Sequence, residues 1–125
     1  MNNTILVIED NEQNLYLIRF MLEQSGFKVY EARDGRQGIA LAGALGPDLI
    51  LLDIQLPELD GYAVATELRK DPSLRETPII AVTSYAMAGD REKALSAGAT
   101  DYIEKPINPS TFLDQIRNSL YGNAT

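Results

Sequence analysis

Cysteine and histidine are both missing from the 125-residue chain. Without cysteine, the protein has no disulfide, no thiolate nucleophile and no zinc–sulfur site. Without histidine, it has no Ser-His-Asp triad, no imidazole general base and no histidine-bound metal. Any metal ion must therefore be held by oxygen atoms, which favours a hard ion such as magnesium, calcium or manganese.

Membrane and nucleic-acid signals are also lacking. No apolar run approaches the roughly 20 residues that a membrane-spanning helix needs, and the start of the chain lacks the basic segment of a signal peptide. We therefore expect a cytoplasmic protein that does not contact a membrane. The formal net charge of −7 disfavours attraction to nucleic-acid phosphates, so direct nucleic-acid binding is not expected. The length fits one domain over residues 1–125.

Short apolar runs alternate five times with segments of helical periodicity. The helical segments are followed by glycine or proline signals, and the last helix carries its apolar residues on one face and is closed by Gly122. Strands that alternate with helices pair in parallel, because right-handed crossovers lay each helix over the sheet. The sequence therefore predicts an α/β fold, a three-layer, doubly wound sandwich around a parallel five-stranded sheet. The predicted strands are Thr4–Ile8, Lys28–Glu31, Asp48–Leu52, Pro78–Val82 and Asp101–Ile103, and the predicted helices are Glu12–Ser25, Asp34–Leu45 (with Ile39 on its inner side), Gly61–Lys70, Asp90–Ala97 and a last helix from Pro109 through Phe112, Ile116 and Leu120.

Charged and hydroxyl residues stand at the carboxyl ends of the predicted strands, where open α/β sheets bind their ligands. Three carboxylates gathered there would repel one another unless a cation neutralised them. Magnesium typically uses one or two carboxylates together with water and a phosphate oxygen. A lysine and hydroxyl or backbone donors suit the oxygens of a phosphoryl group. The combination indicates a phosphoryl-transfer site, made of Glu9-Asp10, Asp53, Thr83-Ser84 and Lys105-Pro106.

The sequence resembles, over essentially its whole length, the receiver domains of two-component response regulators. The segments that carry the resemblance are Ile8-Glu9-Asp10, Asp48 to Gly61 (DLILLDIQLPELDG), Ile80 to Ser84 (IAVTS) and Gly98 to Pro106 (GATDYIEKP). A finer likeness, to stand-alone receivers of the DivK type or receivers attached to hybrid kinases, rests on Glu9-Asp10-Asn11 with Asn14 and on Met87-Ala88-Gly89-Asp90. The resemblance implies a flavodoxin-like fold with strand order 2-1-3-4-5. It also implies a phosphorylated signalling protein rather than a turnover enzyme.

The resemblance assigns the acidic residues to the acceptor and the metal. Asp53 would attack a phosphohistidine on a partner and become an aspartyl phosphate. Asp10, Asp53 and the backbone carbonyl of Gln55 would bind Mg²⁺, with Mn²⁺ as an alternative, and Glu9 would act through ordered water. Taken singly, each of these acids is more typical of a solvated loop or a helix cap, and it is their combination that indicates a site.

The remaining site residues fall on the phosphate side of the implied site. Thr83 and Lys105 would hold the phosphoryl oxygens, a cis peptide bond would join Lys105 to Pro106, and Tyr102 would rotate inward as Thr83 moves. The simpler interpretation of Tyr102 is packing at a strand end. Ser84 stands where the family usually has alanine, so its hydroxyl could alter the lifetime of the phosphate. Gln55 and Tyr85 occupy positions at which the family varies and tunes dephosphorylation.

The implied partners are a sensor histidine kinase or a histidine phosphotransfer protein, and a downstream protein bound by the face of the fourth helix, fifth strand and fifth helix. Three alternatives stay open. The chain could be a receiver from a larger response regulator or hybrid kinase. It could be a phosphatase of the haloacid-dehalogenase type, although that class usually has a second acid where Gln55 stands. It could bind a flavin or dinucleotide, although the turn Glu9–Glu12 lacks the required glycines and is negatively charged.

Overall fold

The structure is a computed structural model that describes residues 3–57, 59–84 and 89–121. Its five strands pair in parallel in the order β2-β1-β3-β4-β5. The predicted three-layer, doubly wound α/β fold and the implied strand order are thereby confirmed. The strands are β1 (Thr4–Ile8), β2 (Lys28–Ala32), β3 (Leu49–Asp53), β4 (Ile79–Thr83) and β5 (Asp101–Glu104).

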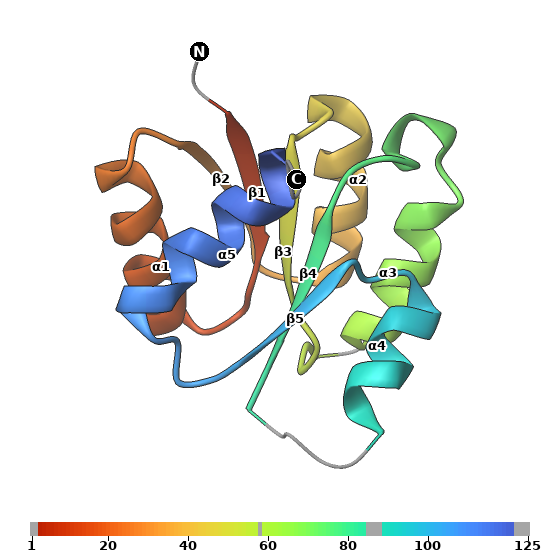
Figure 1. The fold of residues 1–125 in the computed structure, drawn as a ribbon. Helices are drawn as coiled ribbons and strands as arrows, with labels where there is room; N and C mark the ends of the chain where they lie inside the picture. Colours follow the sequence, from red (N-terminus) through yellow and green to blue (C-terminus); the bar gives the residue numbers. More distant parts are fainter. Residues whose placement is uncertain (1–2, 58, 85–88, 122–125) are drawn as a thin grey trace.

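Helices cover both faces of the sheet (Figure 1). Helices α1 (Glu12–Gln24) and α5 (Pro109–Tyr121) lie on one face. Helices α2 (Gly35–Leu45), α3 (Gly61–Arg69) and α4 (Asp90–Ala97) lie on the other. Among the described residues, none of the helices combines the length and the apolar character that crossing a membrane requires.

The bounds of β1 and α4 are as predicted, and those of the other strands and of α1, α2 and α3 differ from the predicted ones by one residue at one or both ends. Strands β3 and β4 each begin and end one residue later than expected, so Asp53 and Thr83 are the last residues of strands. Asp34 precedes α2 as its N-cap, because its side chain accepts the N–H of Gln37. A short 3₁₀ turn at Pro72–Leu74 was not predicted. Gly122, the expected end of the last helix, lies outside the described residues.

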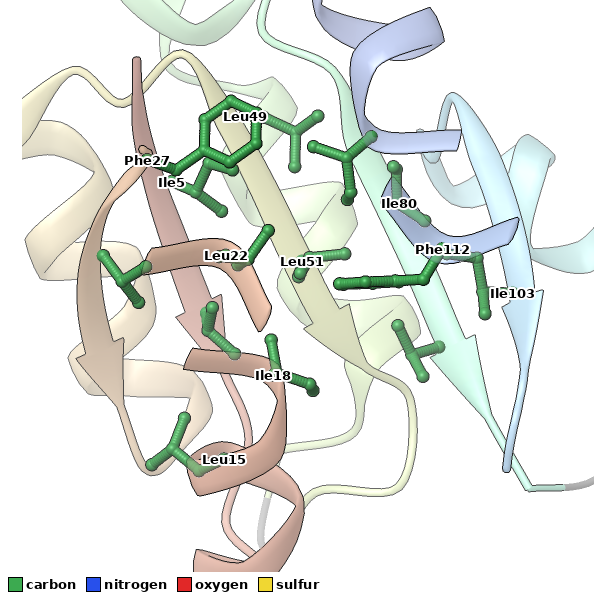
Figure 2. Close-up of a cluster of buried hydrophobic side chains, with 14 residues drawn as sticks. Ile5, Leu15, Ile18, Leu22, Phe27, Leu49, Leu51, Ile80, Ile103 and Phe112 are labelled. Atoms are coloured by element: carbon green, nitrogen blue, oxygen red, sulfur yellow. The ribbon is translucent and has the colours of Figure 1, made fainter. Parts of the chain in front are cut away.

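Two apolar clusters, one on each face, hold the sheet between the helices. In β1, Ile5 and Val7 belong to the cluster under α1 and α5, whereas Leu6 and Ile8 belong to the cluster under α2 and α3. Figure 2 shows the first of these clusters, in which Phe112 of α5 and three residues of α1 converge on β1, β3 and β4. A strand that is covered on both faces needs apolar residues at every position, which explains the continuous apolar runs of the central strands.

Helix α2 approaches the sheet through glycine. A Cβ atom at Gly38 would lie 2.4 Å from the side chain of Ile8, so any larger residue would force that buried side chain to shift. Ile39, which was expected on the inner side of α2, is therefore only partly buried at the margin of the cluster. The close packing of α2 fixes β1, whose end leads into the acidic residues described next.

Candidate functional site

The parallel register brings residues from four strand ends to the same edge of the sheet, at the lower side of Figure 1. Ile8 of β1 pairs with Leu52 of β3, so the residues that follow them, Glu9 and Asp53, reach the same level. Thr83 ends β4, and its carbonyl accepts the backbone N–H of Lys105 at 2.7 Å. The structure thus gathers Glu9, Asp53, Thr83 and Lys105.

Three carboxylates form a cluster at this edge. The ligand oxygens of Glu9, Asp10 and Asp53 lie within 4.8 Å of one another. Glu9 and Asp53 are 1% and 3% exposed, whereas Asp10 is exposed to solvent. Carboxylates packed so closely repel, and a hard cation with oxygen ligands relieves that repulsion. The donor set therefore fits Mg²⁺, with Asp10 on the open side.

A single ammonium group is shared by the two buried acids. Lys105 Nζ lies 3.1 Å from Glu9 Oε1 and 3.3 Å from Asp53 Oδ2. The second oxygen of Asp53, Oδ1, accepts the backbone N–H of Gln55 at 2.9 Å. In the part of the chain that the structure describes, no second basic side chain forms an ion pair with these acids, and one lysine cannot neutralise three carboxylates. The peptide bond between Lys105 and Pro106 is cis.

Burial raises the pKa of Glu9 from its ordinary value of 4.5 to about 7. Loss of hydration is the largest cause, and the hydrogen bond and negative charge of Asp53 add to it. The backbone N–H of Asn11, which donates to Glu9 Oε2 at 3.2 Å, and the charge of Lys105 act in the opposite direction. Glu9 is therefore about half protonated near neutral pH when no cation occupies the cluster.

The loop after β3 returns to the strand at Gly61. The N–H of Gly61 donates to the carbonyl of Ile54 at 2.9 Å. A Cβ atom at Gly61 would lie 2.5 Å from Ile54 Cα and 2.6 Å from the carbonyl oxygen of Asp53. Only glycine allows two backbone segments to approach so closely. The turn therefore fixes the backbone that carries Asp53.

The remaining predicted site residues surround this core. Thr83 is buried and Ser84 exposed, and the Ser84 N–H donates to Gln55 Oε1 at 3.2 Å. Tyr102 is half-buried and packs against a small cluster of the α3–α4 side, where burial raises its pKa. Tyr85 lies outside the described residues. The roles assigned to these residues stay predictions.

The side chain of Gln55 is the contact that sequence reasoning missed. The resemblance assigned its backbone carbonyl to the metal and its position to the tuning of dephosphorylation, but nothing in the sequence distinguishes a glutamine that bridges two loops from one that points into solvent.

Comparisons with known proteins agree on one family. The response regulator receiver domain family matches residues 5–117. The polar-differentiation response regulator DivK of Brucella ovis is 42% identical over 120 residues, which cover 96% of this chain and 98% of DivK. The receiver domain of a sensor histidine kinase from Pseudomonas aeruginosa, solved with magnesium in its active-site cleft, is 39% identical, with a TM-score of 0.88 and coverage of 98% and 100%. The chemotaxis protein CheY4 of Vibrio cholerae has a TM-score of 0.91 at 26% identity, with coverage of 96% and 100%.

Proposed function

The chain belongs to the response regulator receiver domain family, and from this we propose that Asp53 accepts a phosphoryl group from a phosphohistidine on a partner protein, with Mg²⁺ required. One observation carries the proposal. Two buried carboxylates and an exposed one lie within 4.8 Å of one another at the carboxyl edge of the sheet, and one ammonium group forms ion pairs with the two buried ones. Receivers of this family are generally phosphorylated partners in signalling rather than turnover enzymes.

The metal side of the site would be formed by Asp10, Asp53 and the Gln55 carbonyl, with Glu9 acting through water. A bound Mg²⁺ or Mn²⁺ supplies positive charge to the phosphoryl oxygens and relieves the repulsion within the acidic cluster. The magnesium seen in the Pseudomonas aeruginosa receiver domain supports this assignment.

The transfer exchanges one bond to phosphorus for another. A carboxylate oxygen of Asp53 forms a P–O bond while the P–N bond to the donor imidazole breaks, and the electron pair of that bond returns to the imidazole. Lys105, which already contacts Asp53 at 3.3 Å, then pairs with a phosphoryl oxygen, and the Thr83 hydroxyl donates to another. Such catalysis consists of positioning and charge stabilisation, so a chain without histidine needs no base of its own.

Phosphorylation would shift an existing equilibrium between two conformations. Thr83 would move toward the phosphate and Tyr102 inward, which would change the surface of α4, β5 and α5. A downstream protein would read that surface, while a sensor histidine kinase or a histidine phosphotransfer protein would supply the phosphate. No direct contact with nucleic acid or membrane is required.

Phosphotransfer from a phosphorylated histidine kinase tests the proposal. We expect wild-type protein to take up one phosphoryl group per chain with Mg²⁺ and almost none with EDTA, as measured by intact-mass spectrometry. The Asp53→Asn variant should take up none, whereas Asp114→Asn, a control on the exposed part of α5, should behave as wild type. Full labelling of Asp53→Asn would overturn the proposal, and repeated turnover of a phosphate ester would favour the phosphatase alternative.

A further inference from the structure

Helix α4 runs from one edge of the sheet to the other (Figure 1). It follows β4, whose last residue Thr83 lies at the carboxyl edge, and it ends at Gly98, shortly before β5. The backbone N–H of Thr100 donates to the carbonyl of Ile79, the first residue of β4, at 2.7 Å. The amino end of α4 therefore lies toward the edge that carries Asp53, and its carboxyl end lies at the opposite edge.

Arg69 of α3 binds the carboxyl end of α4. Its Nε donates to the carbonyl of Gly98 at 2.9 Å, and a Cβ atom at Gly98 would lie 2.7 Å from Arg69 Cγ. The aliphatic stem of Arg69 thus packs against the residue that ends α4. Thr66, three residues earlier in α3, donates from Oγ1 to the carbonyl of Ala97 at 3.3 Å. A cation that hydrogen-bonds the last carbonyls of a helix also interacts favourably with the helix dipole.

The guanidinium of Arg69 is fixed in turn by the segment before β4. Its Nη1 donates to the carbonyls of Leu74 and Thr77 at 2.8 and 2.7 Å, and its Nη2 donates to the Thr100 hydroxyl at 3.2 Å. Within the described ranges, no carboxylate lies in ion-pairing distance of Arg69. The donors of this planar group are thus directed to the fold itself, and they tie the carboxyl end of α4 to α3 and to the start of β4.

The contact between α3 and the amino half of α4 is of a weaker kind. Lys93 Nζ lies 4.6 Å from the centre of the Tyr62 ring, a cation–π contact made by an exposed lysine. The N-cap of α4 is Gly89, which has no side-chain acceptor for the first N–H groups of the helix. Tyr62, Thr66 and Arg69 are spaced at four and three residues, so one face of α3 contacts α4 along its length.

We propose, resting on the function proposed above, that Arg69 is the pivot of α4. Phosphorylation of Asp53 displaces the amino end of α4, while the carboxyl end keeps its bonds to Arg69. The contact between Lys93 and Tyr62 restrains the amino end in the unphosphorylated protein and breaks when that end moves. A helix fixed at one end turns about that end, so the surface offered to a downstream protein changes most near Asp90 and least near Gly98.

NMR of the protein with beryllofluoride and Mg²⁺, which together mimic the phosphoryl group, tests the pivot. In wild-type protein the Arg69 Nε–H and the amides of Gly98 and Ala99 should keep their chemical shifts and exchange rates, whereas the amide of Lys93 should change. In Arg69→Met the change should spread to Gly98 and Ala99, which a merely structural role of Arg69 would not cause. The control Arg75→Met, at an exposed arginine, should behave as wild type.

Two further variants complete the test. Thr66→Val removes only the bond to the Ala97 carbonyl and should spread the change more weakly, so it serves if Arg69→Met does not fold. Lys93→Met destabilises only the unphosphorylated conformation, so it should bind beryllofluoride about two- to fivefold more tightly in a titration. Arg91→Met removes the same charge from an exposed position of α4 and should bind as wild type.

The outcomes separate the pivot from the function on which it rests. A shift of the Arg69 Nε–H resonance in the wild-type complex, or an unchanged affinity in Lys93→Met, would overturn the pivot and leave the proposed function standing. Wild-type protein that binds no beryllofluoride in the presence of Mg²⁺ and accepts no phosphoryl group at Asp53 would overturn the proposed function itself.

Discussion

Raising the pH from about 5 to 7.5 should destabilise the metal-free protein through Glu9. The pKa of Glu9 is about 7 in the folded protein, against an ordinary value of 4.5. Between these two values the folded protein binds more protons than the unfolded chain. The stabilising contribution of this group is therefore fully present below pH 4.5 and is lost as the pH rises through 7.

The expected loss is large for a domain of this size. The difference between the two pKa values of Glu9 converts to roughly 3 kcal/mol in the free energy of unfolding. About 2 kcal/mol of this loss falls between pH 5 and 7.5. Because Glu9 is only 1% exposed, solvent does little to reduce this figure. A change of about 2 kcal/mol lowers the Tm of such a domain by about 5–10 °C.

Chemical denaturation of metal-free protein at several pH values measures this loss. The Glu9→Gln variant has no carboxyl group to titrate at this position, so its stability should fall much less over the same range. Glu92→Gln, which changes an exposed glutamate of α4, should keep the wild-type slope. Added Mg²⁺ should stabilise wild-type protein more at pH 7.5 than at pH 5, because the ion and the proton compete for the same cluster. Equal slopes in wild type and Glu9→Gln would refute the reasoning.

Three further predictions concern the charge balance and the turn. Lys105→Met leaves two buried carboxylates without their ammonium, so phosphorylation by acetyl phosphate should slow at least about tenfold in intact-mass assays; an unchanged rate would contradict this. Asp10→Asn removes the exposed ligand and should weaken Mg²⁺ binding about tenfold or more in calorimetric titrations, and unaltered affinity would place the ion elsewhere. Gly61→Ala forces a Cβ to within 2.5 Å of the Ile54 backbone and should cost about 1–3 kcal/mol in urea unfolding. Gly43→Ala, where the nearest atom is a side-chain oxygen at 3.4 Å, should cost nothing and serves as its control.

The sequence predicted the fold and the placement of the acidic residues for a physical reason. In a parallel sheet all strands end at the same edge. The residues at the strand ends, Glu9, Asp53 and Lys105, are therefore expected to lie together from the sequence alone. The one-residue difference between the predicted and observed bounds of β3 does not change the site, because Asp53 lies at the edge of the sheet whether it ends the strand or begins the loop.

Other features could not be predicted, because they depend on exact distances. The raised pKa of Glu9 follows from near-complete burial beside Asp53, and an identical sequence pattern with a looser loop would leave that carboxyl hydrated. The contact between Gln55 Oε1 and the Ser84 N–H joins two loops that are 29 residues apart in the sequence, which no local pattern reveals. The partial burial of Ile39 follows from the contact between Gly38 and Ile8, which helical periodicity does not reveal.

The hydrogen bond from the Lys105 backbone N–H to the Thr83 carbonyl couples the positions of these two site residues, so that they form one unit. It closes the ladder between β4 and β5 at the point where both strands reach the acidic cluster. A variant of this domain that shifted β5 to suit a new target would also displace the ammonium that faces Asp53. Natural or designed changes of target are therefore best accommodated on the exposed faces of α4 and α5, where a substitution alters recognition and leaves this unit intact.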